Sequence, residues 1–247
     1  MTGIQIYTVR SLINNEESAV EVMRALSDIG YTSVQLAGGI EAIRLHATAA
    51  EKCGMPVCGI LTNIDVCEEH GERLIEIAHK LGAFDIGISG AAKCASEARE
   101  LATRANSFAR RVRESGLSFS YHNHSHEFIR VEGGETIMDI LLSTFDSELV
   151  DLMPDTYWLQ HGGIDVRDFL EKYGKRVRIL HLKDLKRTPE GVTFAEIGVG
   201  NLNMRGIIDT AKKCGITSFI VEQDICDGDP LVSAKISFEN LKKIMEM

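Results

Sequence analysis

Short runs of β-prone residues alternate with amphipathic segments along the whole chain. After the first run, Ala19, Val22, Met23 and Leu26 recur at the i, i+3, i+4, i+7 spacing of one buried helix face. A glycine closes several such segments, as expected of a residue that reaches the left-handed conformation easily. The pattern predicts helix ends at Gly30, Gly54, Gly82, Gly116, Gly174 and Gly215, and eight strands at Ile4–Val9, Ser33–Leu36, Val57–Thr62, Phe84–Ser89, Leu117–His122, Leu149–Met153, Val177–Leu182 and Phe219–Glu222.

Strands that alternate with helices predict parallel pairing through right-handed crossovers. Eight such units in 247 residues fit an α/β fold of the closed (β/α)8 TIM-barrel type. An open doubly wound sheet is the alternative, and the absence of a G-x-G-x-x-G turn after the first strand disfavours it. The length would also allow two small domains. Because no Pro-, Gly- or Ser-rich linker divides the chain, we expect one domain over residues 1–247.

The charge balance narrows the class of partner. Lys and Arg number 27 against 36 Asp and Glu, a formal net charge of −9. Such a chain lacks the basic surface of a protein that binds nucleic acid phosphates, so small-molecule chemistry is favoured. The first residues form no apolar signal segment and no apolar run reaches 18 residues, so we expect no membrane association and a cytoplasmic location. Six cysteines without a C-x-x-C pair are expected to be reduced thiols.

Imidazoles and carboxylates gather where the last four predicted strands end. In a TIM barrel these ends form the rim that carries the active site. Because barrel strands send every second side chain inward, the residues expected to face the interior are His122, His124, His181, Lys183, Glu222 and Asp224. Asp155 follows the sixth strand. His181 and Glu222 each end an otherwise apolar strand, where an unpartnered polar group is costly, and this favours a functional role.

A convergent set of His, Asp, His and Glu suits a divalent cation such as Mn²⁺, Zn²⁺, Co²⁺ or Mg²⁺. Such an ion can bind two neighbouring oxygens of a hydroxy-ketone and stabilise the enediolate that forms when a carbon-bound proton leaves. A rim carboxylate would serve as the base, and Lys183 could polarise the carbonyl.

Other polar residues admit simpler interpretations. His126 and His161 are expected to be structural, and Glu127 and Glu196 to be solvated loop carboxylates. Trp158 fits equally well as packing or as a wall on which a sugar stacks. The predicted loop TPEGVTFAEIGVGN contains Gly198 and Gly200 but not the P-loop pattern, so it indicates a phosphate site only weakly.

Six strings of the sequence are similar, in their order, to one known family: IQIYTVR, YHNHSHEF, DTYWLQHGGID, LHLKD, EIGVGN and VEQD. Together they resemble the sugar phosphate isomerase/epimerase family, whose barrel is of the xylose isomerase type. The resemblance extends from the first strand to the final helix. It implies a (β/α)8 barrel, a divalent metal ion bound at the rim, and sugars, keto-sugars or inositol derivatives as substrates.

The resemblance also suggests roles for individual positions. Asp155, His181 and Glu222 match three metal-ligand positions of the superfamily. Many related ketose epimerases have a glutamate on strand five as ligand and base, and His122 occupies that place here. His122 or His124 would then bind the metal while the other acts as acid or base, or Glu127 would supply the carboxylate. Gln35 stands where relatives often have a glutamate.

The leading hypothesis is a metal-dependent isomerase or epimerase of a small keto-sugar. Its predicted metal ligands are His122, Asp155, His181 and Glu222; its catalytic residues are His124, Lys183 and Glu222; and its substrate contacts are Gln5, Gln35, Glu127 and Trp158. A dehydratase or lyase acting on a keto-sugar or inosose would use the same site. An endonuclease-like barrel and a non-catalytic sugar-binding barrel are weaker alternatives. The sequence leaves open whether the chain forms a homo-oligomer.

Overall fold

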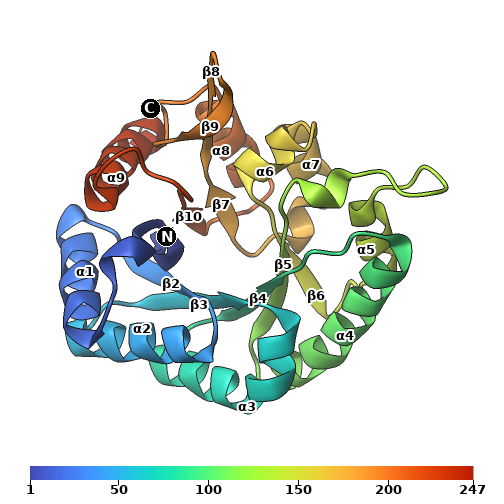
Figure 1. Ribbon diagram of the computed structural model, residues 1–247, viewed down its shortest axis with the longest axis horizontal. Helices are drawn as coiled ribbons and strands as arrows, with labels where there is room; N and C mark the ends of the chain where they lie inside the picture. Colours follow the sequence, from blue (N-terminus) through green and yellow to red (C-terminus); the bar gives the residue numbers. More distant parts are fainter. Residues whose placement is uncertain (247) are drawn as a thin grey trace.

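Parallel pairing joins the predicted strands into one ring (Figure 1). The computed structural model describes residues 1–246. The sheet has eight strands in the order β6-β5-β4-β3-β2-β1-β10-β7. Two parallel bridges, Leu152 with Val177 and Asp155 with His181, connect β6 to β7. The predicted TIM barrel is therefore confirmed, with the strands β1 (Thr2–Gln5), β2 (Ser33–Ala37), β3 (Val57–Thr62), β4 (Asp85–Ser89), β5 (Ser118–His122), β6 (Val150–Met153), β7 (Leu180–Leu182) and β10 (Phe219–Val221).

Helices cover the outside of the ring (Figure 1). The predicted face Ala19, Val22, Met23 and Leu26 is buried against the barrel. Thr136, Asp165 and Asn203 accept backbone N–H groups at the starts of three helices, as their types predict. No helix within residues 1–246 is both long and apolar enough to cross a membrane. The helices are α1 (Glu16–Ile29), α2 (Ile40–Cys53), α3 (Ile64–Leu81), α4 (Ala95–Glu114), α5 (Ile137–Thr144), α6 (Thr156–His161), α7 (Val166–Tyr173), α8 (Met204–Lys213) and α9 (Pro230–Glu246).

Two hydrophobic cores follow from the alternation along the strands. Phe119 and Tyr121 point outward from β5 and pack on Phe108 of α4 and on Phe145. A smaller core fills the barrel interior and consists of Cys58, Leu61, Met153, Ile179 and Ile220. Because apolar side chains occupy the interior below the rim, polar side chains that point inward at the strand ends meet above a packed floor.

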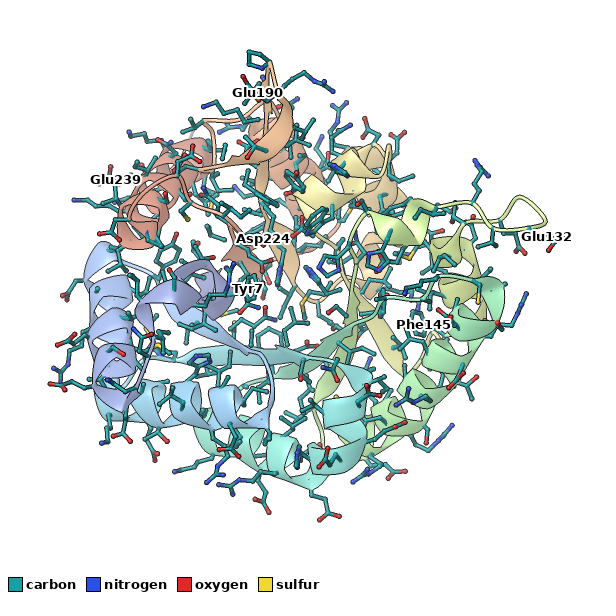
Figure 2. All side chains as sticks on the ribbon, viewed as in Figure 1. Tyr7, Glu132, Phe145, Glu190, Asp224 and Glu239 are labelled. Atoms are coloured by element: carbon teal, nitrogen blue, oxygen red, sulfur yellow. The ribbon has the colours of Figure 1, made fainter. Side chains whose placement is uncertain are left out.

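The predicted first strand is wrong beyond Gln5. Pairing with β2 stops at Gln5, and residues Ile6–Leu12 form the 3-10 helix η1. The Gln5 side chain accepts the Tyr7 N–H and begins this helix. The β-branched residues that suggested a strand, Ile6 and Val9, are buried by the helix instead. The chain thus leaves the sheet early and places Tyr7 at the barrel mouth (Figure 2).

Two other predictions are wrong: the left-handed helix end at Gly174 and the loop between β7 and α8. Gly174 has a φ of −56°, so no left-handed conformation requires a glycine at this position. A side chain there would place its Cβ 2.6 Å from Cys214 Cβ, which explains the residue by packing. The predicted loop TPEGVTFAEIGVGN begins instead within an antiparallel hairpin, β8 (Asp184–Thr188) with β9 (Gly191–Ala195), whose tip carries Glu190 (Figure 2).

Asp85 gives the fold a pH dependence that can be tested. Its side chain is fully buried inside the barrel and accepts one hydrogen bond, from Ser120 Oγ at 2.6 Å. Burial raises the pKa of this carboxyl to about 7, above the value of 3.8 expected when unfolded. Between pH 3.8 and pH 7 the folded state therefore binds a proton that the unfolded state has already released. The stability of the fold falls as the pH rises through this range. From pH 5 to pH 8 this costs about 3 kcal/mol.

We expect Asp85→Asn to remove this loss. The difference in unfolding free energy between the variant and the wild type, from urea titrations, should move in favour of the variant as the pH rises from 5 to 8. Asp151→Asn is the control, because Asp151 is paired with Arg113 at 2.5 Å and Arg178 at 2.8 Å and its replacement should destabilise the fold at neutral pH. An Asp85→Asn difference that is constant with pH would refute the assignment.

Candidate active site

Four strands bring two imidazoles and two carboxylates together at the barrel mouth. His122 ends β5, Asp155 follows β6, His181 lies in β7 and Glu222 follows β10. All four side chains are buried, and one potential ligand atom from each lies within 4.8 Å of all the others. Nitrogen and oxygen ligands about 2.1 Å from one tetrahedral zinc ion stand about 3.4 Å apart. The four atoms are thus somewhat more widely spread than such an ion requires, and small side-chain shifts would bring them around it.

Hydrogen bonds fix the orientation of the His181 ring. Its Nδ1 lies 2.8 Å from Glu222 Oε2, and its Nε2 lies 2.8 Å from Gln35 Oε1. Gln5 Nε2 donates to the same Gln35 oxygen at 2.6 Å. Gln35 and Gln5, both predicted to contact substrate, are fully buried, and Gln5 also borders the mouth pocket.

The loop after β6 holds Asp155 and the end of β7 together. Asp155 Oδ1 accepts the Trp158 N–H at 3.0 Å and so caps α6, while the Asp155 N–H donates to Asn123 Oδ1. Thr156 Oγ1 donates to the Lys183 carbonyl at 2.8 Å and accepts the Lys183 N–H at 2.9 Å. The helix cap made by Asp155 and the two hydrogen bonds of Thr156 together fix the separation of Asp155 and Lys183.

Lys183 lies among three carboxylates. Its Nζ is 3.0 Å from Asp155 Oδ2, 3.1 Å from Glu222 Oε2 and 2.8 Å from Asp224 Oδ1. Burial alone would lower the pKa of Lys183, but these carboxylates raise it above its ordinary value. Burial would likewise raise the pKa of Glu222, yet Lys183 and His181 hold it well below its usual range. The ammonium and the Glu222 carboxylate are therefore both charged at neutral pH.

The donor set fits a divalent metal ion. Burial, followed by the nearby His181, lowers the pKa of His122 well below its usual value, so the ring is neutral. His122 Nδ1 is buried without a hydrogen-bond partner. Asp155 Oδ2 has an ion-pair contact with Lys183 but no hydrogen bond. Neutral imidazole nitrogens and carboxylate oxygens are common ligands of Mn²⁺, Zn²⁺ and Co²⁺, so His122, Asp155, His181 and Glu222 could hold one such ion.

Two connected pockets open above this cluster. The mouth pocket, of about 370 Å³, lies over the strand ends and is lined by residues that include Gln5, Tyr7, His122, Glu222 and Asp224. Asp224 lies near the centre of the ring in Figure 2, next to Tyr7. The lateral pocket, of about 740 Å³, extends toward α3 and α4. Both are lined by Asn63, Ser89 and His124, so the two pockets adjoin at these side chains.

His124 stands between the two pockets, and Glu127 positions it. The Glu127 carboxylate accepts the Tyr121 hydroxyl at 2.9 Å and the His124 N–H at 2.9 Å. Glu127 is fully buried and is not solvated, contrary to the simpler expectation for a loop carboxylate. Burial, followed by Lys183, lowers the pKa of His124 to about 4. The neutral His124 ring thus faces the cavity, and Glu127 reaches it only through the backbone.

We expect Glu127→Gln to lower the unfolding free energy by about 1–3 kcal/mol. The amide nitrogen of Gln would face one of two buried donors, either the Tyr121 hydroxyl or the His124 N–H. Urea titration measures this change. Glu132→Gln, in the exposed loop before α5 (Figure 2), is the control and should change stability by less than about 0.5 kcal/mol. Equal effects in the two variants would rule out the positioning role of Glu127.

Trp158 forms part of the wall of the lateral pocket, and other aromatic side chains pack against it. Trp158 lines the lateral pocket, and its ring centroid is 5.3 Å from that of His124. Phe194, from the hairpin, lies 5.7 Å from Trp158 and stacks on Tyr157 at 4.4 Å. Trp158 Nε1 is buried without a partner. Sequence analysis missed the contribution of Phe194, although Pro189-Glu190-Gly191 between β-prone residues is a turn signal that could have revealed the hairpin.

Nearly the whole chain matches one protein family. The model of the xylose isomerase-like TIM barrel family matches residues 23–244. The chain therefore belongs to this family. Among curated proteins it is similar to the inosose dehydratase of Clostridium perfringens, with 33% identity over 37% of the chain and 30% of that protein. The inosose dehydratase of Mesomycoplasma hyopneumoniae is 30% identical over 60% of the chain and 55% of that protein. The match thus spans about a third to a half of these relatives.

Solved structures show the same fold at low sequence identity. A sugar phosphate isomerase/epimerase from Parabacteroides distasonis has a TM-score of 0.82 at 21% identity, covering 98% of this chain and 97% of that one. A 3-keto-D-glucoside 4-epimerase from E. coli has a TM-score of 0.72 at 13% identity, with 100% and 99% covered. The IOLI protein, solved with a bound zinc atom, has a TM-score of 0.76 at 11% identity, with 99% and 98% covered.

Proposed function

We propose that this protein is a metal-dependent isomerase or epimerase of a small keto-sugar. The observation that carries the proposal is the buried cluster of His122, Asp155, His181 and Glu222 at the floor of an open pocket. A buried set of two imidazoles and two carboxylates is costly unless positive charge compensates it, as Lys183 does here and a bound metal ion would. The zinc-containing structural relative and the sugar epimerases of the same fold support this choice.

The residues around the cluster divide the work of moving a proton. When bound, a divalent ion supplies Lewis-acid polarisation of a carbonyl and its neighbouring hydroxyl. Glu222, kept ionised by Lys183 and His181, accepts the proton from the carbon next to the carbonyl. Neutral His124, across the mouth pocket on the chain after β5, takes up or returns a proton on the other side of the substrate. Lys183 donates to the oxygen that gains negative charge.

Hydrogen exchange in deuterated water tests this proposal. The protein is stripped with a chelator, reloaded separately with Mn²⁺, Co²⁺, Zn²⁺ or Mg²⁺, and incubated with a panel of ketoses. We expect proton NMR to show deuterium at the carbon beside the carbonyl with at least one metal and one ketose. His181→Ala is the control and should show no exchange. Absence of exchange for every metal and ketose would exclude the proposed reaction, and binding that needs neither metal nor His181 would indicate a sugar-binding barrel.

A dehydratase or lyase is the second candidate, and the inosose dehydratases among the curated relatives favour it. The same base would remove the carbon-bound proton, after which a hydroxyl or an aglycone on the next carbon would leave. The leaving group needs a proton. Lys183, the buried ammonium beside Asp155 and Asp224, would supply it. Incubation with a keto-inositol and with keto-glycosides separates the two: an unsaturated product or free aglycone indicates elimination, and an epimer indicates isomerisation.

A further inference from the structure

The cavity is larger than a single small sugar requires, and its two parts differ in character. The mouth pocket holds the reactive cluster, whereas the lateral pocket has about twice its volume and contains Ile64, Leu101 and Ala92 beside polar groups. Trp158 Nε1 and His124 Nδ1 are buried without partners next to it. An apolar floor, an aromatic ring and unpaired donors or acceptors are features that bind a sugar ring or an aglycone.

The charges around the lateral pocket oppose an anionic substituent. Its lining includes the carboxylates of Asp65, Glu97 and Glu100, and Arg104 is the single Lys or Arg among the described lining residues. The Arg104 guanidinium is already paired with Asp65 at 2.5 Å and with Glu68 at 2.6 Å. A phosphate in this pocket would therefore face uncompensated negative charge, because the available cation is neutralised by its own partners.

The usual phosphate position of a TIM barrel is also occupied. Many barrels bind phosphate with backbone N–H groups of the loops after the last two strands. Here the fully buried Asp184 accepts the N–H groups of Gly198 at 2.9 Å and Gly200 at 3.2 Å with Oδ2. Its Oδ1 accepts those of Leu185 at 2.8 Å and Leu202 at 3.2 Å. The glycine loop that weakly suggested a phosphate site thus encloses a carboxylate of the chain itself.

We propose that the lateral pocket is a second sugar subsite and that the substrate is an uncharged keto-glycoside rather than a sugar phosphate. The inference rests on the proposed function, because the reacting ketose lies over the metal-ligand cluster in the mouth pocket. The group attached at the far end of that ketose enters the lateral pocket between Trp158 and Leu101. Lys183 is not among the residues that line the lateral pocket, so it offers no contact to a phosphate bound there. Arg10 stands outside both linings and is bonded to the Tyr7 carbonyl.

Three probes that share one ketose test the inference. D-Fructose, its 6-phosphate and its 6-O-glucoside isomaltulose differ only at the oxygen remote from the carbonyl. In calorimetric titrations of the Mn²⁺-loaded protein, isomaltulose should bind at least tenfold more tightly than D-fructose, and the 6-phosphate at least tenfold more weakly. Glu100→Lys, on the exposed face of α4, should strengthen binding of the 6-phosphate several-fold, because it reverses one charge at the pocket.

A steric variant checks where the glucosyl group binds. Ala91→Trp places a large ring in the lateral pocket from an exposed position and should reduce the affinity for isomaltulose to that for D-fructose. Ser96→Trp, also exposed but outside the pocket lining, is the matched control and should change neither affinity. Tighter binding of the 6-phosphate than of D-fructose, or no effect of Ala91→Trp on isomaltulose, would overturn the inference and leave the proposed function standing. If none of the three binds, the ketose assignment fails and the inference falls with it.

Discussion

Glu222→Gln is expected to lower the rate of hydrogen exchange at the substrate carbon at least a thousandfold. This corresponds to a loss of about 4 kcal/mol of transition-state stabilisation. The Glu222 carboxylate contacts His181 at 2.8 Å and Lys183 at 3.1 Å, and it lines the mouth pocket. An amide of the same shape cannot accept the proton, and it loses the charge that binds a cation. The rate is followed by proton NMR in deuterated water with the metal and ketose identified in the panel.

Two variants control for this loss. Asp224→Asn removes one of the three carboxylates around Lys183 and should reduce the rate by about tenfold, because Asp224 is not among the four potential metal ligands. Glu239→Gln, on the exposed face of α9 (Figure 2), should leave the rate unchanged. A Glu222→Gln protein that folds normally by circular dichroism and keeps more than a tenth of the wild-type rate would show that Glu222 is neither base nor essential ligand.

Lys183→Met is expected to make the protein strongly dependent on a divalent ion for its stability. In the metal-free protein, the ammonium compensates the buried carboxylates of Asp155, Glu222 and Asp224. Its removal should lower the unfolding free energy by about 3 kcal/mol when a chelator is present. It should also raise the affinity for Mn²⁺ at least tenfold, because a positive charge beside the ion is gone. The rise in Tm on adding Mn²⁺ should thus be clearly larger for the variant than for the wild type.

Lys186→Met is the matched control, since Lys186 lies three residues further along and is exposed on the hairpin. Its Tm with chelator and with Mn²⁺ should follow those of the wild type. The Lys183 result does not depend on knowing the substrate, because only unfolding is measured. Equal Mn²⁺-induced shifts in wild type and Lys183→Met would mean that the ion, if it binds, does so away from this cluster.

The fold was predictable because it repeats a simple periodicity. Eight β-prone runs separated by amphipathic segments leave little choice but a ring of parallel strands, and the buried face of α1 contains the four residues that its spacing predicted. The errors lie where local propensity and tertiary pairing disagree. Ile6 and Val9 favour a strand, but β1 stops pairing with β2 at Gln5, although β2 continues to Ala37, and residues Ile6–Leu12 coil into a 3-10 helix over the mouth.

The candidate site was predictable in its inward residues but not in its contacts. Alternation along the strands placed His181, Lys183 and Glu222 inside, where the structure has them. The sequence could not choose between His122 and Glu127, because that depends on the turn after β5, in which the Glu127 carboxylate folds back to Tyr121 and the His124 N–H. The three partners of Lys183 come from two other strand ends, and no local pattern encodes such a convergence.

The central claim, that these four side chains form a metal site, is tested most directly by an anomalous-scattering map. Crystals grown with Mn²⁺ should show one strong peak in contact with His122, Asp155, His181 and Glu222, with the Lys183 ammonium no longer against Asp155. A map without a peak in this cluster at saturating Mn²⁺, in which Lys183 Nζ still lies between Asp155 and Glu222, would contradict the account.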